Sequence, residues 1–478
     1  MSSVVTMAGA APAAALLAAQ KAAHERDGPP GAAVRRERLE RCVALLSLHK
    51  EDIVAALGAD FGARSADMSR LTDIAAAIAP LKFARAKLEG WMRPERRQVE
   101  APLGLIGAKA EVRFQPKGVV GIISPWNFPV QLTFAPLAGV LAAGNRCLIK
   151  PSELTPATGA LLAQLFSLFF KPEEAAVVTG GPEIGAAFAA LPFDHLVFTG
   201  SGAVAKHVMR AAAENLTPLT LELGGKSPVI LSRTADLEKA AARIMAGKTM
   251  NAGQICLAPD YLLAPSALCE AFVAAAGAAV AKMYPKLKNN PDYASLIDHR
   301  HYERVRALLA DARAKGARII ELNPLKEDFS QQEHWKIPPA LVLDVTDDMR
   351  IMQEEIFGPL LPVKTYGALD EALAAVNARP RPLAVYYFGN DRAEMEAILA
   401  GTVSGGVAVN DVVFHASVED LPFGGVGASG MGAYHGRDGF LEFSHKKAVF
   451  TQTPHELTAL LRPPYGEMFR KFLAPRLK

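Results

Sequence analysis

Short apolar runs alternate with longer segments of helical periodicity from residue 118 onward, and this alternation constrains the fold more than any other feature. The apolar runs of the first block are residues 119–123, 147–149, 176–178, 196–198, 219–221 and 229–231. The helical patterns between them are residues 134–143, 157–169, 184–190 and 204–213. Strands that alternate with helices form a parallel sheet with helices on both faces. Ligands of such a sheet bind beyond the carboxyl ends of its strands.

A second alternating block extends from residue 237 to about residue 410. Its expected strands are residues 261–263, 340–343, 361–364, 385–388 and 407–409. Its expected helices are residues 271–283, 302–314, 369–378 and 393–399. The chain is therefore predicted to be an α/β protein with two doubly wound parallel-sheet domains.

The flanking segments differ from these two blocks. Residues 32–57 and 71–90 carry apolar residues at helical spacing, so we expect helices there. Residues 99–115 mix Pro and Gly with short alternating pieces, which predicts a projecting hairpin. The first 20 residues are Ala-rich without a basic leader, which favours a frayed or helical tail over a secretory signal. The last residues, 461–478, are basic and amphipathic.

Composition excludes several classes of protein. The 52 Lys and Arg residues nearly balance the 49 Asp and Glu residues, so neither nucleic acid nor an acidic membrane is an expected partner. We find no uninterrupted apolar run of about 18 residues, and expect no membrane span. The four cysteines form no CxxC pair and have no His at ligand spacing, so we expect no disulfide framework, no metal site and a reducing, cytoplasmic compartment.

Two motifs place a reactive side chain beside small residues. Glu222 opens the run Glu-Leu-Gly-Gly-Lys, and Cys256 closes the run Gly-Gln-Ile-Cys 34 residues later. Glycines allow close approach of a ligand, a thiol beside backbone N–H groups can have a low pKa, and a carboxylate can activate water. An isolated cysteine is more often an inert buried thiol, so that alternative stays open on these residues alone.

Three further motifs follow expected strands. Asn127 lies in Pro-Trp-Asn-Phe-Pro, where its amide could donate to an oxyanion or simply form an Asx turn. Lys150 opens Lys-Pro-Ser-Glu, which could hold ribose hydroxyls. Gly200 precedes Ser-Gly at a strand–helix turn whose N–H groups suit a pyrophosphate, although a single Gly-x-Gly is a weak signal. The runs at residues 354–359 and 421–427 add further glycine-containing turns.

Together, and in this order, these motifs resemble those of the aldehyde dehydrogenase superfamily over nearly the whole chain. The runs at residues 256–261, 409–412 and 430–436 are similar to the class-three branch, which includes bacterial coniferyl-aldehyde dehydrogenases. The resemblance implies a Rossmann-like cofactor domain (residues 1–98 and 116–226), a catalytic domain (227–420) and a small β oligomerisation arm (99–115 with about 440–455), followed by a tail (456–478).

The resemblance also implies the reaction. It makes Cys256 the nucleophile, Glu222 the general base, and Asn127 with the Cys256 backbone N–H the oxyanion donors. An aromatic or medium-chain aliphatic aldehyde would be oxidised to the carboxylic acid through a thiohemiacetal and a thioester. NAD or NADP would be the cofactor, and the protein would form a homodimer.

The binding residues follow from the same resemblance. The implied cofactor site consists of Trp126, Lys150, Ser152, Glu153, Gly200, Ser201, Leu223, Glu355 and Phe357. Gly202 and Ala205 depart from the Thr and the last Gly of the family's usual pyrophosphate turn, which leaves the preference between NAD and NADP open. The implied substrate pocket contains Leu132, Phe414 and His415, although the first two could equally be core residues and the third a structural hydrogen bonder.

Two other functions remain as alternatives. A CoA-acylating aldehyde dehydrogenase would pass the thioester to CoA, but it has no need of a water-activating base at Glu222. A non-catalytic binding protein could share the fold, but it would not need Cys256, Glu222 and Asn127 together.

Overall fold

The computed structural model describes residues 9–101, 103–454 and 457–478. A six-stranded sheet forms the centre of the first α/β domain, in the order β15-β7-β6-β3-β4-β5. Its strands are β3 (Val119–Ile123), β4 (Arg146–Lys150), β5 (Ala175–Val177), β6 (His195–Gly200), β7 (Leu219–Leu223) and β15 (Gly430–Met431). Its crossover helices are α6 (Gln131–Ala142), α7 (Pro156–Phe169), α8 (Pro182–Ala189) and α9 (Gly202–Ala213).

Each of these parallel strands coincides with an expected apolar run. They are buried because helices cover both sheet faces, so their sequences show little polar alternation. β15 was not expected. It has only two residues, and it pairs antiparallel with β7, placing Gly430 opposite Glu222. The chain segment after the second domain therefore returns to the first sheet.

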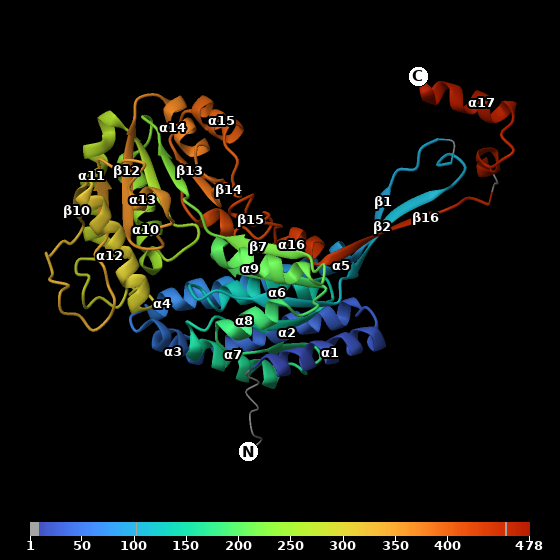
Figure 1. Cartoon of the computed structure of the whole chain (residues 1–478), viewed down its shortest axis with the longest axis horizontal. Helices are drawn as coiled ribbons and strands as arrows, with labels where there is room; N and C mark the ends of the chain where they lie inside the picture. Colours follow the sequence, from blue (N-terminus) through green and yellow to red (C-terminus); the bar gives the residue numbers. More distant parts are fainter. Residues whose placement is uncertain (1–8, 102, 455–456) are drawn as a thin grey trace, which may run out of the picture.

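A seven-stranded sheet forms the second domain, in the order β10-β11-β12-β9-β8-β13-β14. Its strands are β8 (Pro228–Leu231), β9 (Tyr261–Pro265), β10 (Arg318–Glu321), β11 (Ala340–Leu343), β12 (Leu360–Tyr366), β13 (Ala384–Phe388) and β14 (Gly406–Val409). Its helices are α10 (Leu237–Thr249), α11 (Cys269–Met283), α12 (His299–Ala314), α13 (Arg350–Gln353), α14 (Leu369–Asn377) and α15 (Arg392–Gly401). The two parallel-sheet domains confirm the predicted fold class (Figure 1).

The N-terminal helices pack against the first domain. They are α1 (Ala10–Asp27), α2 (Ala32–Leu48), α3 (Lys50–Phe61), α4 (Ala66–Ser69), a π-helical turn (Arg70–Ala75) and α5 (Ala76–Met92). The single helical run expected over residues 32–57 is broken at His49. The Ala-rich segment is helical from residue 10 and is not frayed there, because Leu16 and Leu17 are buried and Gln20 donates to the Cys147 carbonyl. Residues 1–8 lie outside the described part of the chain.

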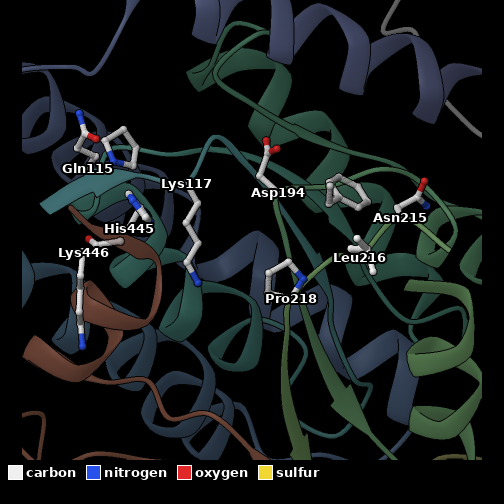
Figure 2. A pocket seen from close by; sticks show the side chains of 11 residues that line it. Gln115, Lys117, Asp194, Asn215, Leu216, Pro218, His445 and Lys446 are labelled. Atoms are coloured by element: carbon white, nitrogen blue, oxygen red, sulfur yellow. The ribbon is translucent and has the colours of Figure 1, made fainter. Parts of the chain in front are cut away.

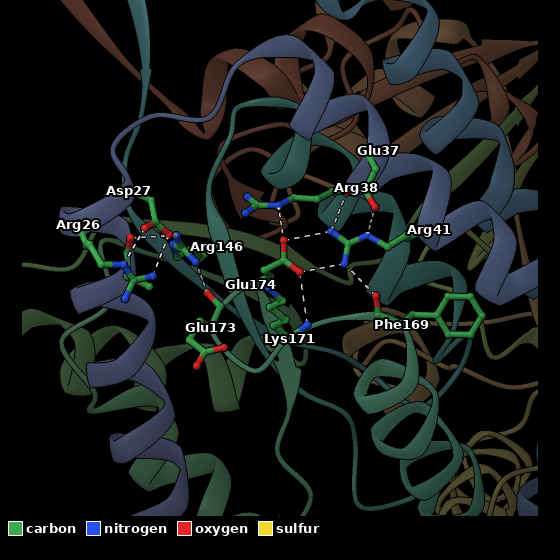
Figure 3. Close-up of polar contacts among 11 residues, drawn as sticks. Arg26, Asp27, Glu37, Arg38, Arg41, Arg146, Phe169, Lys171, Glu173 and Glu174 are labelled. Carbon is green, nitrogen blue, oxygen red and sulfur yellow. Dashed lines mark hydrogen bonds and ion pairs between the residues drawn. The ribbon is translucent and has the colours of Figure 1, made fainter.

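A partly buried carboxylate joins α2 to the first sheet. Glu174 precedes β5 and accepts hydrogen bonds from Arg38 at 3.2 Å and from Arg41 at 2.8 and 3.0 Å (Figure 3). Partial burial alone would raise the pKa of Glu174, but the hydrogen bond and charge of Arg41, with the charge of Arg38, lower it to about 2. The carboxylate is therefore ionised at neutral pH and stabilises the docking of α2.

A three-stranded antiparallel sheet projects from the first domain (Figure 1). It consists of β1 (Glu95–Arg97), β2 (Lys109–Pro116) and β16 (Ser444–Thr451), the last preceded by α16 (Gly436–Glu442). The projecting hairpin was expected at residues 99–115. Its first strand instead lies earlier, and most of residues 98–108 form the connection. The described C-terminal residues form short helical pieces, including α17 (Glu467–Leu473), at the end of this arm.

One described helix is long and apolar enough, by length and composition alone, to cross a membrane: Ser266–Met283. Within it Phe272, Ala276 and Val280 are buried in the core, and α11 packs against α10. Core helices of globular domains pass the same test, so this helix is weak evidence for a membrane span.

Candidate active site

The loop that carries Cys256 has an unusual backbone. After α10, Asn251, Ala252 and Gly253 adopt positive φ values of 49°, 53° and 75°. Such a run is uncommon for residues with a side chain and is maintained only when the surroundings enforce it. The Gln254 side chain does so by donating to the Asn251 and Ser295 carbonyls, at 2.9 and 3.0 Å, and by accepting from the Ile297 N–H at 2.9 Å.

Gly253 has no substitute in this loop. A Cβ atom there would lie 2.3 Å from the carbonyl oxygen of Gly358, a backbone atom that cannot move by itself. The loop therefore brings the segment containing Cys256 against the backbone that follows Glu355. This close approach is the physical reason for a glycine three residues before the cysteine.

The Cys256 thiol does not have the low pKa that we expected from its neighbouring N–H groups. Burial, then the charges of Glu222 and Glu355, raise the pKa of this thiol, and the nearby backbone N–H groups of Cys256 and Leu257 offset only part of the shift. The net shift is upward from the ordinary value. Cys256 is therefore a protonated thiol at neutral pH, and it needs a base before it can attack.

Glu222 lies on β7 with its carboxyl group buried. Neither oxygen has a well-formed hydrogen bond among the described residues. Burial raises the pKa of Glu222 well above its ordinary value, and the Gly425 N–H offsets only part of this shift. A carboxyl group with a strongly raised pKa beside a cysteine is typical of a proton-transfer site rather than of a surface salt bridge.

Asn127 is held against the cysteine loop. Its side-chain amide donates to the Gln254 carbonyl at 3.1 Å, and its backbone carbonyl accepts from the Asn251 side chain at 3.2 Å. The turn of residues 124–130, which connects β3 to α6, thus joins the loop 251–256 at the boundary between the two domains. Cys256, Glu222 and Asn127, which come from three separate elements, are brought together.

Glu355 approaches the backbone beside Glu222. A Cβ atom on Gly224 would lie 2.1 Å from a carboxylate oxygen of Glu355, so a larger residue there would displace this carboxylate. Burial first, then the charge of Asp260, raises the pKa of Glu355 to about 8, against opposing effects of the Gly225 N–H and Lys226. One Glu355 oxygen is buried without a hydrogen-bond partner among the described residues. That oxygen could accept a ligand hydroxyl.

Aromatic side chains cover the same region. Phe357 meets Trp126 edge to face, with ring centroids 5.3 Å apart, and His301 also packs edge to face with Trp126, at 4.9 Å. Phe357 itself has a positive φ of 46°, which turns the chain directly after Glu355. Trp126 precedes Asn127, so these rings form a wall between the Asn127 turn and the Glu355 segment.

The remaining predicted cofactor residues lie at strand ends of the first sheet. Lys150 ends β4, and its buried ammonium group donates to Glu153 at 3.1 Å. The Ser152 hydroxyl accepts from the Leu154 N–H at 3.2 Å. Ser201 caps α9 by accepting from the N–H three residues later, at 3.3 Å.

These residues fit a dinucleotide cofactor. The ends of β4 and β6 lie at one edge of a parallel sheet, where such ligands bind, and the backbone N–H groups at the start of α9 suit a pyrophosphate. Gly200 pairs with the buried Leu223 on β7, which connects this edge to Glu222. Ala205, where the family usually has glycine, is buried in α9 without breaking the helix.

The three predicted pocket residues have different surroundings. Leu132 is buried in the core at 6% exposure, whereas Phe414 is 62% exposed in the turn Phe414–Ser417. The partly buried His415 ring packs against Tyr386, whose hydroxyl donates to the Leu257 carbonyl at 2.7 Å. Of these three residues, only His415 is linked to the segment after Cys256 by the contacts given above, through Tyr386.

Sequence reasoning missed several residues near this site. Tyr434 is buried with an unpartnered hydroxyl among the described residues, and burial, then the charges of Glu222 and Cys256, raise its pKa. Burial lowers the pKa of Lys248 to about 8, beside Asp260. The run containing Tyr434 was noted only for its resemblance to the family. A lysine such as Lys248 in a helical pattern is normally interpreted as a solvent-exposed residue.

A separate hollow of about 730 Å³ lies where the arm meets the first domain (Figure 2). Its rim includes Lys117, Asp194, His445 and Lys446. None of the predicted site residues lines it. This hollow is therefore separate from the candidate active site.

The family model that matches the sequence is the Aldehyde dehydrogenase family, over residues 2–449. The chain belongs to the aldehyde dehydrogenase family. It is an oxidoreductase that oxidises aldehydes with NAD or NADP as cofactor.

Its relatives include a probable coniferyl aldehyde dehydrogenase of Caulobacter vibrioides, 63% identical over 97% of this chain and 96% of the relative. A coniferyl aldehyde dehydrogenase of a Pseudomonas species is 53% identical, covering 95% and 94%. Among solved structures, substrate-bound AldH of Staphylococcus aureus has a TM-score of 0.90 at 37% identity, covering 97% and 99%. An NAD⁺ complex of a Mycobacterium tuberculosis aldehyde dehydrogenase has a TM-score of 0.84 at 30% identity, covering 94% and 92%.

Proposed function

We propose that this protein oxidises aromatic aldehydes of the coniferyl type to carboxylic acids, with Cys256 as nucleophile and Glu222 as general base. The carrying observation is that the partly buried Cys256 thiol lies close enough to the buried Glu222 carboxyl group for its charge to raise the thiol pKa, while the Asn127 amide donates to the Gln254 carbonyl, two residues before the cysteine. The names of the two relatives at 63% and 53% identity support the aromatic substrate.

The first step is the attack of the Cys256 sulfur on the aldehyde carbon. Ionised Glu222 accepts the thiol proton, and a carbon–sulfur bond forms as the carbonyl oxygen becomes an oxyanion. The Asn127 amide and the Cys256 N–H donate to this oxygen. Loss of one such donor typically costs on the order of a hundredfold in rate.

NAD or NADP, when bound, accepts the hydride that leaves the substrate carbon. The product on the enzyme is a thioester at Cys256. Glu222 releases the thiol proton to solvent and then takes a proton from water, whose oxygen attacks the thioester carbon. The carbon–sulfur bond breaks, the carboxylic acid leaves, and Cys256 is regenerated.

We assign cofactor binding to the residues at the carboxyl ends of the strands of the first sheet and to those around Glu355. Lys150 and Glu153, with Ser152 beside them, would hold the adenine ribose, and the turn Gly200–Ser201 the pyrophosphate. Glu355 would accept from the nicotinamide ribose, with Phe357, Trp126 and Leu223 packed around it. The unpartnered oxygen of Glu355 supports this assignment.

For the substrate pocket we retain His415 as a lining residue, supported by its packing on Tyr386. The burial of Leu132 favours a core role, and the exposure of Phe414 allows a place at the mouth of the pocket.

We further propose that the protein is a cytoplasmic homodimer in which the arm forms part of the interface. The projecting arm ends in two edge strands, β1 and β16, which offer unpaired backbone groups to a second copy. Four free cysteines fit a reducing compartment. We retain the division into a cofactor domain (1–98 and 116–226), a catalytic domain (227–420), an arm and a tail, with β15 added to the first sheet.

A panel of aliphatic and aromatic aldehydes, each assayed with NAD and with NADP by absorbance of the reduced cofactor, tests this function. The proposal predicts the highest kcat/KM for cinnamyl-type aromatic aldehydes, with the free acid as product. A product that forms only as a CoA thioester would make the protein a CoA-acylating enzyme. If no aldehyde gave reduced cofactor, the protein would be a non-catalytic binding protein with the same fold.

A further inference from the structure

We propose that Arg64 is a positioning residue for the reaction, which sets the place of the Asn127 amide through a buried ring of hydrogen bonds. This inference rests on the proposed oxyanion role of Asn127. Arg64 lies in the short loop between α3 and α4, outside all the motifs that the sequence singled out.

The Arg64 side chain is fully buried in a narrow, shaped site. One terminal nitrogen donates to the Asn127 backbone carbonyl at 2.8 Å, and the other donates to Asp73. The guanidinium group lies over the rings of Phe61 and Phe128, at 4.4 and 5.1 Å from their centroids. Both ring contacts and both hydrogen bonds require the planar fork of an arginine.

Asp73 links Arg64 to the C-terminal end of the same turn. Its second oxygen accepts from the Val130 N–H at 3.2 Å and from the Gln131 N–H at 3.4 Å, where α6 begins. The pair Arg64–Asp73 therefore holds the turn at Asn127 and at its C-terminal end. Neither partner needs to touch substrate to decide where the amide points.

A second set of bonds connects Arg64's loop to the cysteine loop. Ser295 donates its hydroxyl to the Phe61 carbonyl and its N–H to the Ala63 carbonyl, the latter at 2.8 Å. Its own carbonyl accepts from Gln254 at 3.0 Å. The Gln254 carbonyl in turn accepts from the Asn127 amide at 3.1 Å.

These contacts form a closed ring through Arg64, Asn127, Gln254 and Ser295. The ring uses one of the two amide hydrogens of Asn127 and leaves the other for an oxyanion. It also fixes the Asn127 turn relative to the loop of Cys256, although the two belong to different domains. A donor of this kind must lie about 2.7–3.1 Å from the oxyanion, and a displacement of about 1 Å can cost a hundredfold in rate.

A buried ion pair usually adds little to the free energy of unfolding. Its desolvation cost often exceeds its attraction, and apolar replacement of both partners is often neutral. The double variant Arg64→Met with Asp73→Leu is therefore expected to fold, since it leaves no isolated buried charge. It removes the hydrogen bond from Arg64 to the Asn127 carbonyl.

The test is a double-mutant cycle on pre-steady-state hydride transfer. We expect this double variant to lower the single-turnover rate 10- to 100-fold in the wild-type background, with NADH affinity within twofold. In an Asn127→Ala background the same change is expected to cost less than threefold, because the amide to be positioned is gone. Equal losses in both backgrounds, or no loss in either, would overturn the inference.

Three variants separate the possible failures. Asn127→Ala with wild-type rate would refute the proposed oxyanion role, whatever Arg64 does. Arg64→Lys keeps a charge beside Asp73 but cannot bond both partners, so kcat is expected to fall at least fivefold with an unchanged melting temperature. Arg38→Met removes another buried arginine, remote from Asn127, and is expected to retain the wild-type rate. A wild-type kcat in Arg64→Lys would also overturn the inference.

Discussion

The pKa of Glu355 predicts how tightly the protein binds its cofactor at different pH values. In the folded chain burial and Asp260 raise this pKa to about 8, so the carboxyl group is mostly neutral at pH 7. Two ribose hydroxyls donate well to an ionised carboxylate, which is an acceptor only, and poorly to a carboxyl group that keeps its proton. The ionised form is therefore the binding-competent form.

The magnitude follows from the fraction that is ionised. With a pKa of about 8, about one eleventh of the Glu355 carboxyl is ionised at pH 7 and about ten elevenths at pH 9. The apparent dissociation constant is the intrinsic constant divided by that fraction. The dissociation constant of NADH is therefore expected to fall about tenfold between pH 7 and pH 9, or about 1.4 kcal/mol of binding free energy.

Fluorescence titration with NADH at half-unit steps measures this slope without turnover. Glu355→Gln should bind NADH with a dissociation constant that is flat over this range, close to the wild-type value at pH 7. Glu354→Gln is the matched control, since this neighbouring carboxylate pairs with Arg350 on the surface, and it should keep the wild-type slope. A flat wild-type titration, or the same slope in Glu355→Gln, would refute the reasoning.

Three further perturbations have defined outcomes. Cys256→Ala should abolish aldehyde oxidation while leaving NADH affinity within twofold, and residual turnover above 1% would remove it from the nucleophile role. Gly253→Ala should lower the free energy of unfolding by at least about 1–2 kcal/mol, since φ there is positive and a Cβ meets the Gly358 backbone, whereas Gly58→Ala in α3 meets nothing and should not destabilise. The ionised Glu174 carboxylate, whose pKa is lowered, stabilises the fold above about pH 4.5, and this contribution is lost as pH falls toward 2. Between pH 5 and pH 3 the melting temperature of Glu174→Gln should therefore fall by less than that of the wild type.

The sheets were predictable because buried parallel strands have a simple signature. Each of the runs at β3, β4, β6 and β13 is apolar without alternation, and each ends at a turn residue. The short edge strands β10 and β15 escaped prediction, since β10 has only two apolar residues and β15 only two residues in all. Their pairing is decided by tertiary contacts that local pattern does not contain.

The site was predictable as a set of motifs but not as a set of electrostatic environments. Cys256, Glu222 and Asn127 were named from their runs, yet the direction of the thiol pKa was wrong. Burial, together with the charges of Glu222 and Glu355 from distant parts of the chain, outweighs the effect of the local N–H groups. Arg64 left no signal at all, because a single arginine between two helices normally reads as a surface residue.

The central claim is that Cys256 carries the substrate as a thioester that Glu222 helps water to release. Glu222→Gln, mixed with coniferyl aldehyde and NAD and quenched in acid within one turnover, allows peptide mass spectrometry to locate any acyl adduct. Because Glu222 also accepts the thiol proton in the first step, the account predicts that the adduct forms more slowly than in wild type. It predicts one adduct, on the peptide containing Cys256, with NADH formed in the same amount as the adduct and slow release of acid. An adduct on Cys42, Cys147 or Cys269, or rapid acid formation with no adduct, would contradict it.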